Sequence, residues 1–409
     1  MKMSRVDPLL LCALAITQTV GWGATYYLPS AFSLSLQRDL GFSPAMVFSA
    51  VTALLVTGAL MAPFVGRYLE HARTMPVLVA CSLGGATGLG LLSQAQGLWS
   101  YLAAWVVIGS SSATILTLAS HVIVVRASGD KGQSAITLLA VVGGLSVAVF
   151  WPLTEYLLRH LSWREVAMIY ALLHLVICAP LHALVVGRAD RRHQRALSDP
   201  DHRPHAIVSR LDLEARRAGF WFAVLAFSSA GFVSWGLPLH FIAIFQEAGI
   251  GFAVAVWLGS LSGPSQVLAR AVQWLWLDKV ADPVRIALWS AVITVPVVVA
   301  PLFFGFGVVF AFVFVVTYGL VSGWVSLARS TLPLVLFGSG GFATLIGRLA
   351  LPLNLTFAAS PTFYALVMER TGTRGAIIIS LVLLVVSALA FLQLDRLARP
   401  VTGAQPSET

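Results

Sequence analysis

The sequence has 409 residues, of which 58% are hydrophobic and only 11% are charged. That balance is far too apolar for a soluble domain of this size and predicts a membrane protein. The formal net charge of +9 would suit a nucleic-acid partner, but the cations follow the gaps between apolar runs instead of forming one basic patch. Nucleic acid is therefore excluded as a partner, and the lipid bilayer is expected.

Apolar runs of about 20 residues recur along the whole chain, and each is long enough to cross roughly 30 Å of hydrocarbon as a helix. Lys2 and Arg5 precede the first run as in a signal peptide, but the run is too long and no small-residue cleavage site ends it. We therefore expect it to remain as the first helix. The twelve predicted spans are 8–35, 44–65, 75–95, 98–125, 134–158, 164–187, 218–246, 250–277, 283–305, 308–335, 341–367 and 374–395.

Lysine and arginine are concentrated in alternate connecting segments, most of all in 188–217. By the positive-inside rule these segments are cytoplasmic, so both termini are predicted to face the cytoplasm. The abundance of arginine and the compact loops suggest a bacterial inner membrane.

The polar segment 188–217 divides the spans into six and six. The predicted organisation is an N-terminal six-helix half (1–187), a basic linker (188–217), a C-terminal six-helix half (218–398) and a tail (399–409). The halves match at an offset of 208 residues, as Asp39 with Glu247 and Glu70 with Asp278. The expected fold is therefore all-α, with twelve transmembrane helices in two pseudo-symmetric halves.

Loop motifs resemble those of the major facilitator superfamily. "GRYLEHAR" (66–73) is similar to its signature loop, with Glu70 in place of Asp and His71 in place of Arg, and "WLWLDK" (274–279) is similar to the partner loop in the second half. "LSWR" (161–164) resembles the common Gly-Trp-Arg. The resemblance covers almost the whole chain and implies a transporter that works by alternating access.

The first span resembles the monocarboxylate-porter and oxalate:formate-antiporter branch. The matching residues are Trp22, Tyr26, Pro29, Asp39 and Gly41, and on helix 8 Arg270 and Asp278, with Trp274 at the position of the signature Gly. The resemblance implies that Arg270 holds a substrate carboxylate. Ser30 stands where mammalian-type porters have Lys, which argues against proton coupling through helix 1. The oxalate:formate antiporter instead has a second cation on helix 11, and Arg348 lies on that helix.

Three arginines, Arg270, Arg329 and Arg348, fall inside predicted spans at about the same depth. Burying an arginine in a membrane is costly unless it is paired, and no Asp or Glu lies deep in any span. Either an anionic substrate supplies the charge, or the arginines reach water, carbonyls or the cytoplasmic gate. The planar guanidinium suits a carboxylate. The repeat mate of Arg329 is His121, which favours a gate position for Arg329.

Other polar residues inside spans are weaker candidates, with interhelical hydrogen bonding and interface anchoring as the alternatives. Those that could line the cavity with the arginines are Tyr26, Tyr27, Trp235, Gln266 and Asn354. If protons drive transport, His240, two residues after Pro238, is the candidate for coupling. The predicted cytoplasmic gate comprises Glu70, His71, Arg73, Asp278 and Lys279.

The leading hypothesis is a transporter of a small organic anion, a mono- or dicarboxylate. The alternatives are an exporter of drugs or amphipathic metabolites and a non-transporting membrane receptor. No catalytic motif, metal-ligand spacing or phosphate-binding loop is found, so we expect no enzyme activity, metal or cofactor. The protein is expected to be a monomer. Transport is either coupled to protons or proceeds as uniport or anion exchange.

Overall fold

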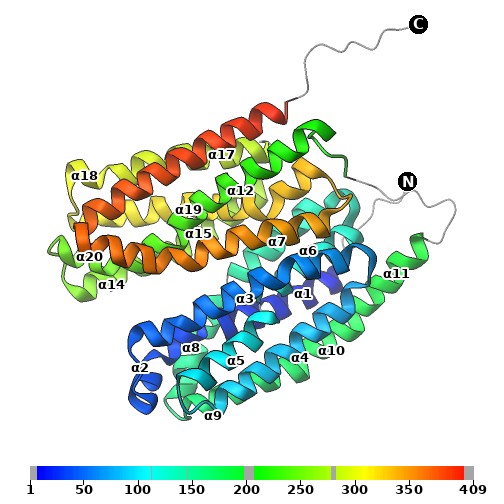
Figure 1. The fold of residues 1–409 in the computed structure, drawn as a ribbon, viewed down its shortest axis with the longest axis horizontal. Helices are drawn as coiled ribbons and strands as arrows, with labels where there is room; N and C mark the ends of the chain where they lie inside the picture. Colours follow the sequence, from blue (N-terminus) through cyan, green and yellow to red (C-terminus); the bar gives the residue numbers. More distant parts are fainter. Residues whose placement is uncertain (1–6, 112, 145, 198–206, 278–281, 400–409) are drawn as a thin grey trace, which may run out of the picture. The chain divides into compact units, whose positions relative to one another are not determined.

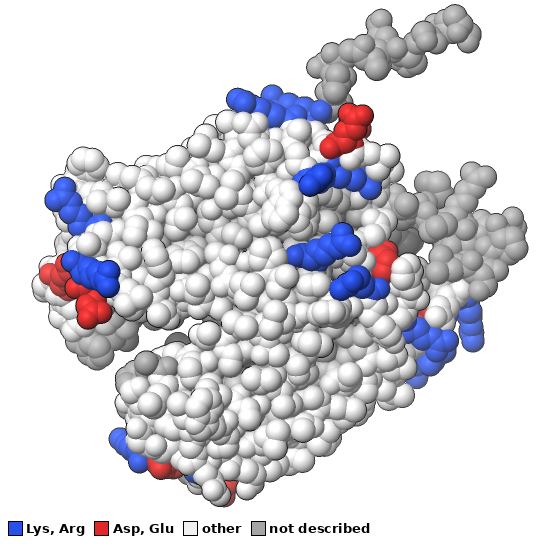
Figure 2. Space-filling model, viewed as in Figure 1, with Lys and Arg blue, Asp and Glu red and all other residues white. Residues whose placement is uncertain are grey.

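The computed structural model describes residues 7–111, 113–144, 146–197, 207–277 and 282–399. These residues form helices and connecting turns, with no strand among them (Figure 1). Wide uncharged stretches run along the helices, and charged groups lie mainly towards their ends (Figure 2). This pattern is that of a multi-pass membrane protein.

The first six predicted spans are confirmed as helical segments. Two of them, 98–125 and 134–158, are each built from two helices, and the last continues to Leu197, ten residues past its predicted end. The segments are α1 (Pro8–Gly21), η1 (Trp22–Tyr26) and α2 (Leu28–Leu40); α3 (Pro44–His71); α4 (Thr74–Ser93); α5 (Leu98–Ser110) and α6 (Ala113–Ser128); α7 (Gly132–Gly144) and α8 (Ser146–Leu158), after the turn η2 (Gly129–Lys131); and α9 (Trp163–Leu173), η3 (His174–Cys178), α10 (Ala179–Leu181), η4 (His182–Val186) and α11 (Gly187–Leu197).

The remaining spans are confirmed in the same way. The last two are merged in one 56-residue helix, but Gly372 has a φ of 63° and breaks it into two. The segments are α12 (Leu213–Gly236), η5 (Leu237–His240) and α13 (Phe241–Glu247); α14 (Phe252–Ser260), α15 (Ser262–Val272) and η6 (Gln273–Leu277); α17 (Pro283–Val299) and α18 (Pro301–Phe304); α19 (Val308–Phe337); and α20 (Phe342–Leu397).

Eight of the described helices are individually long and apolar enough to cross a membrane. The other spans are either broken by turns into shorter apolar helices or share α20. The architecture is therefore the expected one of twelve transmembrane helices in two six-helix halves.

Local chemistry explains many of the helix boundaries. Asp7 accepts from the backbone N–H of Leu9 (3.0 Å) and precedes Pro8 at the first helical position of α1. Ser162 and Glu165 form a capping box at the start of α9. Gly338 and Gly341 adopt positive φ (76° and 70°) and form the tight turn between α19 and α20.

The chain divides into two compact units. Unit 1 contains residues 1–206, 270–274 and 341–363, and unit 2 contains 207–269, 275–340 and 364–409. Two short segments of the second sequence half, one with Arg270 and one with Arg348, thus belong to unit 1. The sequence-based domain boundaries of 187, 217 and 398 remain predictions.

Corresponding close helix crossings occur in both units. In unit 1, a Cβ on Gly109 of α5 would lie 2.9 Å from the Leu54 Cα of α3. In unit 2, a Cβ on Gly319 of α19 would lie 2.7 Å from the Ser262 carbonyl oxygen of α15. Leu54 and Ser262 are separated by the repeat offset of 208 residues, whereas the glycines Gly109 and Gly319 are 210 residues apart. The two halves therefore share a close, glycine-dependent crossing of related helices, with the glycine shifted by two residues.

Candidate functional site

Arg270 lies near the end of α15 and is half-buried. Its Nη1 donates to the Ala140 carbonyl oxygen of α7 at 3.4 Å, a contact within unit 1. The π-helical turn η6 follows three residues later. Such turns in membrane helices frequently occur at functional sites. The guanidinium is thus held against the backbone of a neighbouring helix, well inside the apolar part of the chain.

Tyr27 is an electrostatic neighbour of Arg270. It follows the π-helical turn η1, in which Trp22 and Tyr26 form an edge-to-face pair at 5.5 Å, and Tyr26 in turn packs against Tyr27 at 5.1 Å. Proline cannot donate a backbone hydrogen bond, so Pro29 two residues later makes the local helix irregular. The structure therefore brings Tyr26 and Tyr27, two predicted site residues, into the surroundings of Arg270.

A chain of side-chain hydrogen bonds extends this aromatic group. Trp22 Nε1 donates to Thr117 Oγ1 of α6 at 3.2 Å, and Thr117 Oγ1 donates to Gln18 Oε1 at 2.9 Å. Thr117 was absent from the predicted site because a lone threonine in an apolar run carries no sequence signal. It fixes the indole ring that packs on Tyr26.

Arg348 lies on α20 with its side chain exposed, whereas Asn354, further along the same helix, is half-buried. Gly347 beside Arg348 crosses α3 closely, because a Cβ there would lie 2.5 Å from the Ala62 carbonyl oxygen. A Cβ on Gly66 would likewise lie 2.5 Å from the Ala343 carbonyl oxygen. The two glycines therefore let α3 and α20 touch through their backbones in unit 1.

The predicted gate residue Glu70 lies at the same crossing. Its Oε2 accepts from the backbone N–H of Thr344 at 3.2 Å, in the first turn of α20. A carboxylate is stabilised there by the unpaired amides and the positive end of the helix dipole. His71 ends α3 and Arg73 precedes α4, and both are exposed. Asp278 and Lys279 lie outside the described residues.

Two residues that the sequence did not single out hold the loop between α3 and α4 in place. Arg126 of α6 donates from Nη1 to the Ala72 carbonyl (3.0 Å) and from Nη2 to the carbonyls of Leu69 and Glu70. Asp190 of α11 accepts from the backbone N–H of Met75 at 2.6 Å. These charges satisfy the carbonyls at the end of α3 and an amide at the start of α4.

The other predicted site residues lie in unit 2. The Arg329 guanidinium is 5.9 Å from the Trp235 ring, a cation–π contact between α19 and α12. His240 in the turn η5 packs against Tyr364 at 6.3 Å. Gln266 is half-buried on α15, and its carbonyl oxygen would lie 2.7 Å from a Cβ on Gly323. The structure thus pairs Arg329 with Trp235, two residues that the sequence predicted separately.

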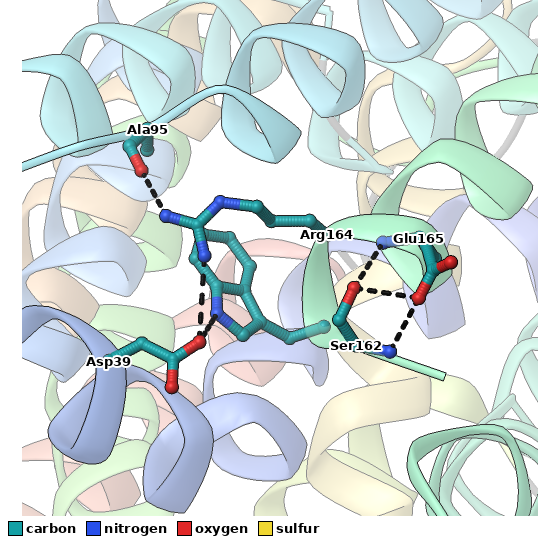
Figure 3. Close-up of polar contacts among 6 residues, drawn as sticks. Asp39, Ala95, Ser162, Arg164 and Glu165 are labelled. Atoms are coloured by element: carbon teal, nitrogen blue, oxygen red, sulfur yellow. Dashed lines mark hydrogen bonds and ion pairs between the residues drawn. The ribbon is translucent and has the colours of Figure 1, made fainter. Parts of the chain in front are cut away.

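Another polar group lies at the opposite end of unit 1 (Figure 3). Asp39 Oδ2 accepts from Trp163 Nε1 at 2.9 Å and from Arg164 Nη1 at 3.5 Å, while Arg164 Nη2 donates to the Ala95 carbonyl at 2.9 Å. In unit 2 the repeat mate Glu247 accepts from the backbone N–H of Thr373 at 3.2 Å. In each half an acid at the end of the first helix therefore binds the start of the last helix.

A cavity of about 570 Å³ lies in unit 2, lined by Arg210, Asp212, Asp282, Arg285, Asp395, Ala398 and Arg399. Its charges largely neutralise one another, as in Arg210–Asp282 at 2.6 Å and Arg285–Asp395 at 3.8 Å. A second cavity, of about 10 Å³, lies inside unit 1 between α1, α4 and the π-helical turns η3 and η4. That volume is near the minimum for one water molecule. Neither cavity includes Arg270.

Within the described part of the chain, buried carboxylates occur at Asp190 and Asp395, near the start of α11 and the end of α20. No cluster of three or more potential metal ligands is found among those same residues. The helices that carry the half-buried cations Arg270 and Arg329, α15 and α19, contain no Asp or Glu of their own.

The sequence matches the family model described as "Major Facilitator Superfamily" over residues 14–344. No curated protein sequence matches the chain.

Among solved structures, the human organic anion transporter MFSD10 (TETRAN) is similar with a TM-score of 0.67 and 15% identity, covering 96% of this chain and 100% of that one. A bacterial homologue of the iron transporter ferroportin, in an outward-facing state, is similar with a TM-score of 0.75 and 12% identity, covering 96% and 100%. The same homologue with soaked iron gives 0.74 and 12%, covering 96% and 99%. At these identities the likeness establishes the fold.

Proposed function

The chain belongs to the major facilitator superfamily of membrane transporters, and from that premise we propose that it moves a small organic anion, a mono- or dicarboxylate, by alternating access. The single observation that carries the proposal is Arg270, a half-buried cation beside Tyr27 on α15, an apolar helix that itself contains no Asp or Glu. A carboxylate substrate is a suitable ligand for a guanidinium in this setting.

The Arg270 contact favours exchange with a substrate. Its bond to the Ala140 carbonyl is long at 3.4 Å and has a neutral acceptor. A carboxylate is a stronger acceptor and can take two parallel bonds from the planar guanidinium. The phenol of Tyr27 is a further donor for the same anion. Binding would therefore add a charged pair at this helix–helix contact.

Arg348 is the proposed second cation and favours a dicarboxylate over a monocarboxylate. Under the offset of 208 residues, Ala62 is the repeat mate of Arg270, and Ala140 is the repeat mate of Arg348. Arg270 contacts Ala140, and Ala62 lies against Gly347, next to Arg348. The two arginines thus occupy related positions at two related crossings, as expected for a ligand with an anionic group at each end.

The same crossings supply the proposed gate. Glu70 holds the first turn of α20, and the Gly66–Gly347 contact brings α3 and α20 together. Alternating access requires contacts of this kind to open and close once per cycle. His71, Arg73, Asp278 and Lys279 complete the proposed gate. Asn354, Gln266 and Trp235 are proposed to line the cavity, and Arg329 is proposed either to bind substrate or to serve the gate.

Coupling and localisation remain proposals of the same kind. His240, packed on Tyr364, is the proposed proton carrier if transport is coupled to protons, and anion exchange needs no such group. We propose a monomer in a bacterial inner membrane with both termini in the cytoplasm. An exporter of amphipathic compounds is the second candidate, favoured by the aromatic group of Trp22, Tyr26 and Tyr27.

Uptake of radiolabelled mono- and dicarboxylates into proteoliposomes tests the proposal. Removing a charged hydrogen bond costs about 1.5–3 kcal/mol, so Arg270→Gln should reduce uptake at low substrate concentration about 10- to 100-fold. Arg270→Lys should retain part of it. Arg374→Gln, which removes an exposed arginine of α20 outside the proposed site and gate, is the matched control and should transport normally. Equal uptake by Arg270→Gln and the control would refute the assigned role.

Arg348→Gln separates the substrate classes. A dicarboxylate should lose affinity in this variant, whereas a monocarboxylate held by Arg270 alone should not. Export of neutral or cationic compounds with no carboxylate uptake would support the second candidate instead.

A further inference from the structure

Four arginines gather on α11, the helical extension that follows η4. From Trp163 to Gly187 the chain rises about 36 Å at 1.5 Å per residue, which exceeds the roughly 30 Å of a hydrocarbon core. α11 therefore begins where this helix leaves the hydrocarbon. Its sequence, GRADRRHQRAL, is polar and strongly basic.

The two faces of α11 differ sharply. Ala189 and Asp190 are buried (8% and 3% exposed) and pack into unit 1, whereas Arg188, Arg191, Arg192 and Arg195 are exposed. Arg188, Arg191 and Arg195 follow the i, i+3, i+7 spacing that places side chains on one helix face. These three arginines therefore form a row on one face of α11.

The row is fixed in position by two contacts. Asp190 Oδ2 accepts from the Met75 N–H at 2.6 Å, and Arg192 Nη1 forms an ion pair with Asp7 at 2.8 Å. Within the part of the chain that the structure describes, neither Arg188, Arg191 nor Arg195 forms an ion pair. Three cations therefore lie on a helix that is held in position, at the level of the lipid headgroups.

We propose that Arg188, Arg191 and Arg195 bind the phosphate groups of anionic lipids. Guanidinium pairs with phosphate through two parallel hydrogen bonds, and basic clusters directly beside a transmembrane helix attract anionic headgroups. Because the row is already held in place, binding requires little further ordering of the backbone. A solvated basic loop would need no such anchoring by Asp190 and Arg192. The proposal is independent of the transported substrate.

The test compares purified full-length protein in nanodiscs of phosphatidylcholine alone and in nanodiscs that also contain phosphatidylglycerol. The thermal unfolding midpoint and the number of phosphatidylglycerol molecules retained in native mass spectrometry are measured for the wild type and for R188Q/R191Q/R195Q. The control is R38Q/R370Q/R374Q, which removes three other exposed arginines.

We expect phosphatidylglycerol to raise the midpoint of the wild type and the control, and to raise that of the α11 variant much less, with fewer lipids retained. An equal response of all three proteins would overturn the proposal. Stabilisation by soluble glycerol phosphate without lipid would also overturn it, because the site would then serve a free phosphate. If R188Q/R191Q/R195Q does not fold, the proposal is tested with R191Q and with the wild type in high salt. In both cases phosphatidylglycerol should raise the unfolding midpoint less than it does for the wild type in low salt. An unchanged rise in both would overturn the proposal.

Discussion

Gly347 offers a direct test of the backbone crossing between α3 and α20. An added Cβ would lie 2.5 Å from the Ala62 carbonyl oxygen, whereas ordinary contacts begin at 3.4 Å. The helices must therefore separate by about 1 Å, and such overpacking typically costs about 1–3 kcal/mol. Alanine also favours a helix over glycine by up to about 1 kcal/mol, which partly hides this cost.

Gly90→Ala on α4 is the control for this gain in helix propensity, because nothing lies within 4 Å of its added Cβ. We expect Gly347→Ala to be less stable than Gly90→Ala by about 1–3 kcal/mol in urea unfolding of the protein in lipid nanodiscs. Gly66→Ala adds its methyl to the same crossing, so the double variant Gly66→Ala/Gly347→Ala should lose less than the sum of the two. If Gly347→Ala is as stable as Gly90→Ala, the close crossing is absent and the reasoning fails.

Three further substitutions probe the polar contacts. Glu70→Gln removes the charge from the first turn of α20 and should lower stability by about 0.3–1 kcal/mol in the same unfolding assay, with Glu70→Asp closer to the wild type. Arg126→Gln leaves the carbonyls at the end of α3 without their hydrogen-bond donor and should lower the free energy of unfolding by about 1–3 kcal/mol. An unchanged urea midpoint would show that water donates to those carbonyls instead. Asp39→Asn should cost no more than about 1 kcal/mol, because its partner Arg164 is partly exposed, and should alter the fluorescence of Trp163.

The twelve spans followed from the sequence because a bilayer allows few solutions. A helix must satisfy its own backbone and be about 20 apolar residues long, so composition alone locates it. The irregular turns were harder to predict. The π-helical turns η3 and η4 flank Pro180, which cannot donate a helical hydrogen bond, but the sequence does not say how the neighbouring turns adjust.

The predicted linker, 188–217, is polar and basic, but its first part is helical. Its first ten residues, up to Leu197, continue as α11, although they have no apolar periodicity. Arginine, alanine, glutamine and leucine all favour helix, and Asp190 gains a backbone amide from α4. That partner is 115 residues away in sequence, and long-range contacts of this kind leave no local pattern.

The candidate site residues stand out in the sequence, but the groups that they contact do not. An arginine in an apolar run is conspicuous, whereas the Ala140 carbonyl that it contacts belongs to a backbone without distinguishing chemistry. Arg126 lies just after the predicted span 98–125, and its hydrogen bonds depend on where the carbonyls of α3 end. The sequence therefore reveals charged side chains in apolar runs but not the neutral backbone groups to which they donate.

The internal repeat relates Arg270 to Arg348. The first half has alanine at both related positions, Ala62 and Ala140, and the second half has arginine at both. Packing alone does not favour this difference, because each arginine adds a charge where an alanine allows the helices to approach. The proposed dicarboxylate, with one anionic group for each arginine, would account for cations at both positions, and Arg348→Gln with dicarboxylate and monocarboxylate substrates tests that explanation.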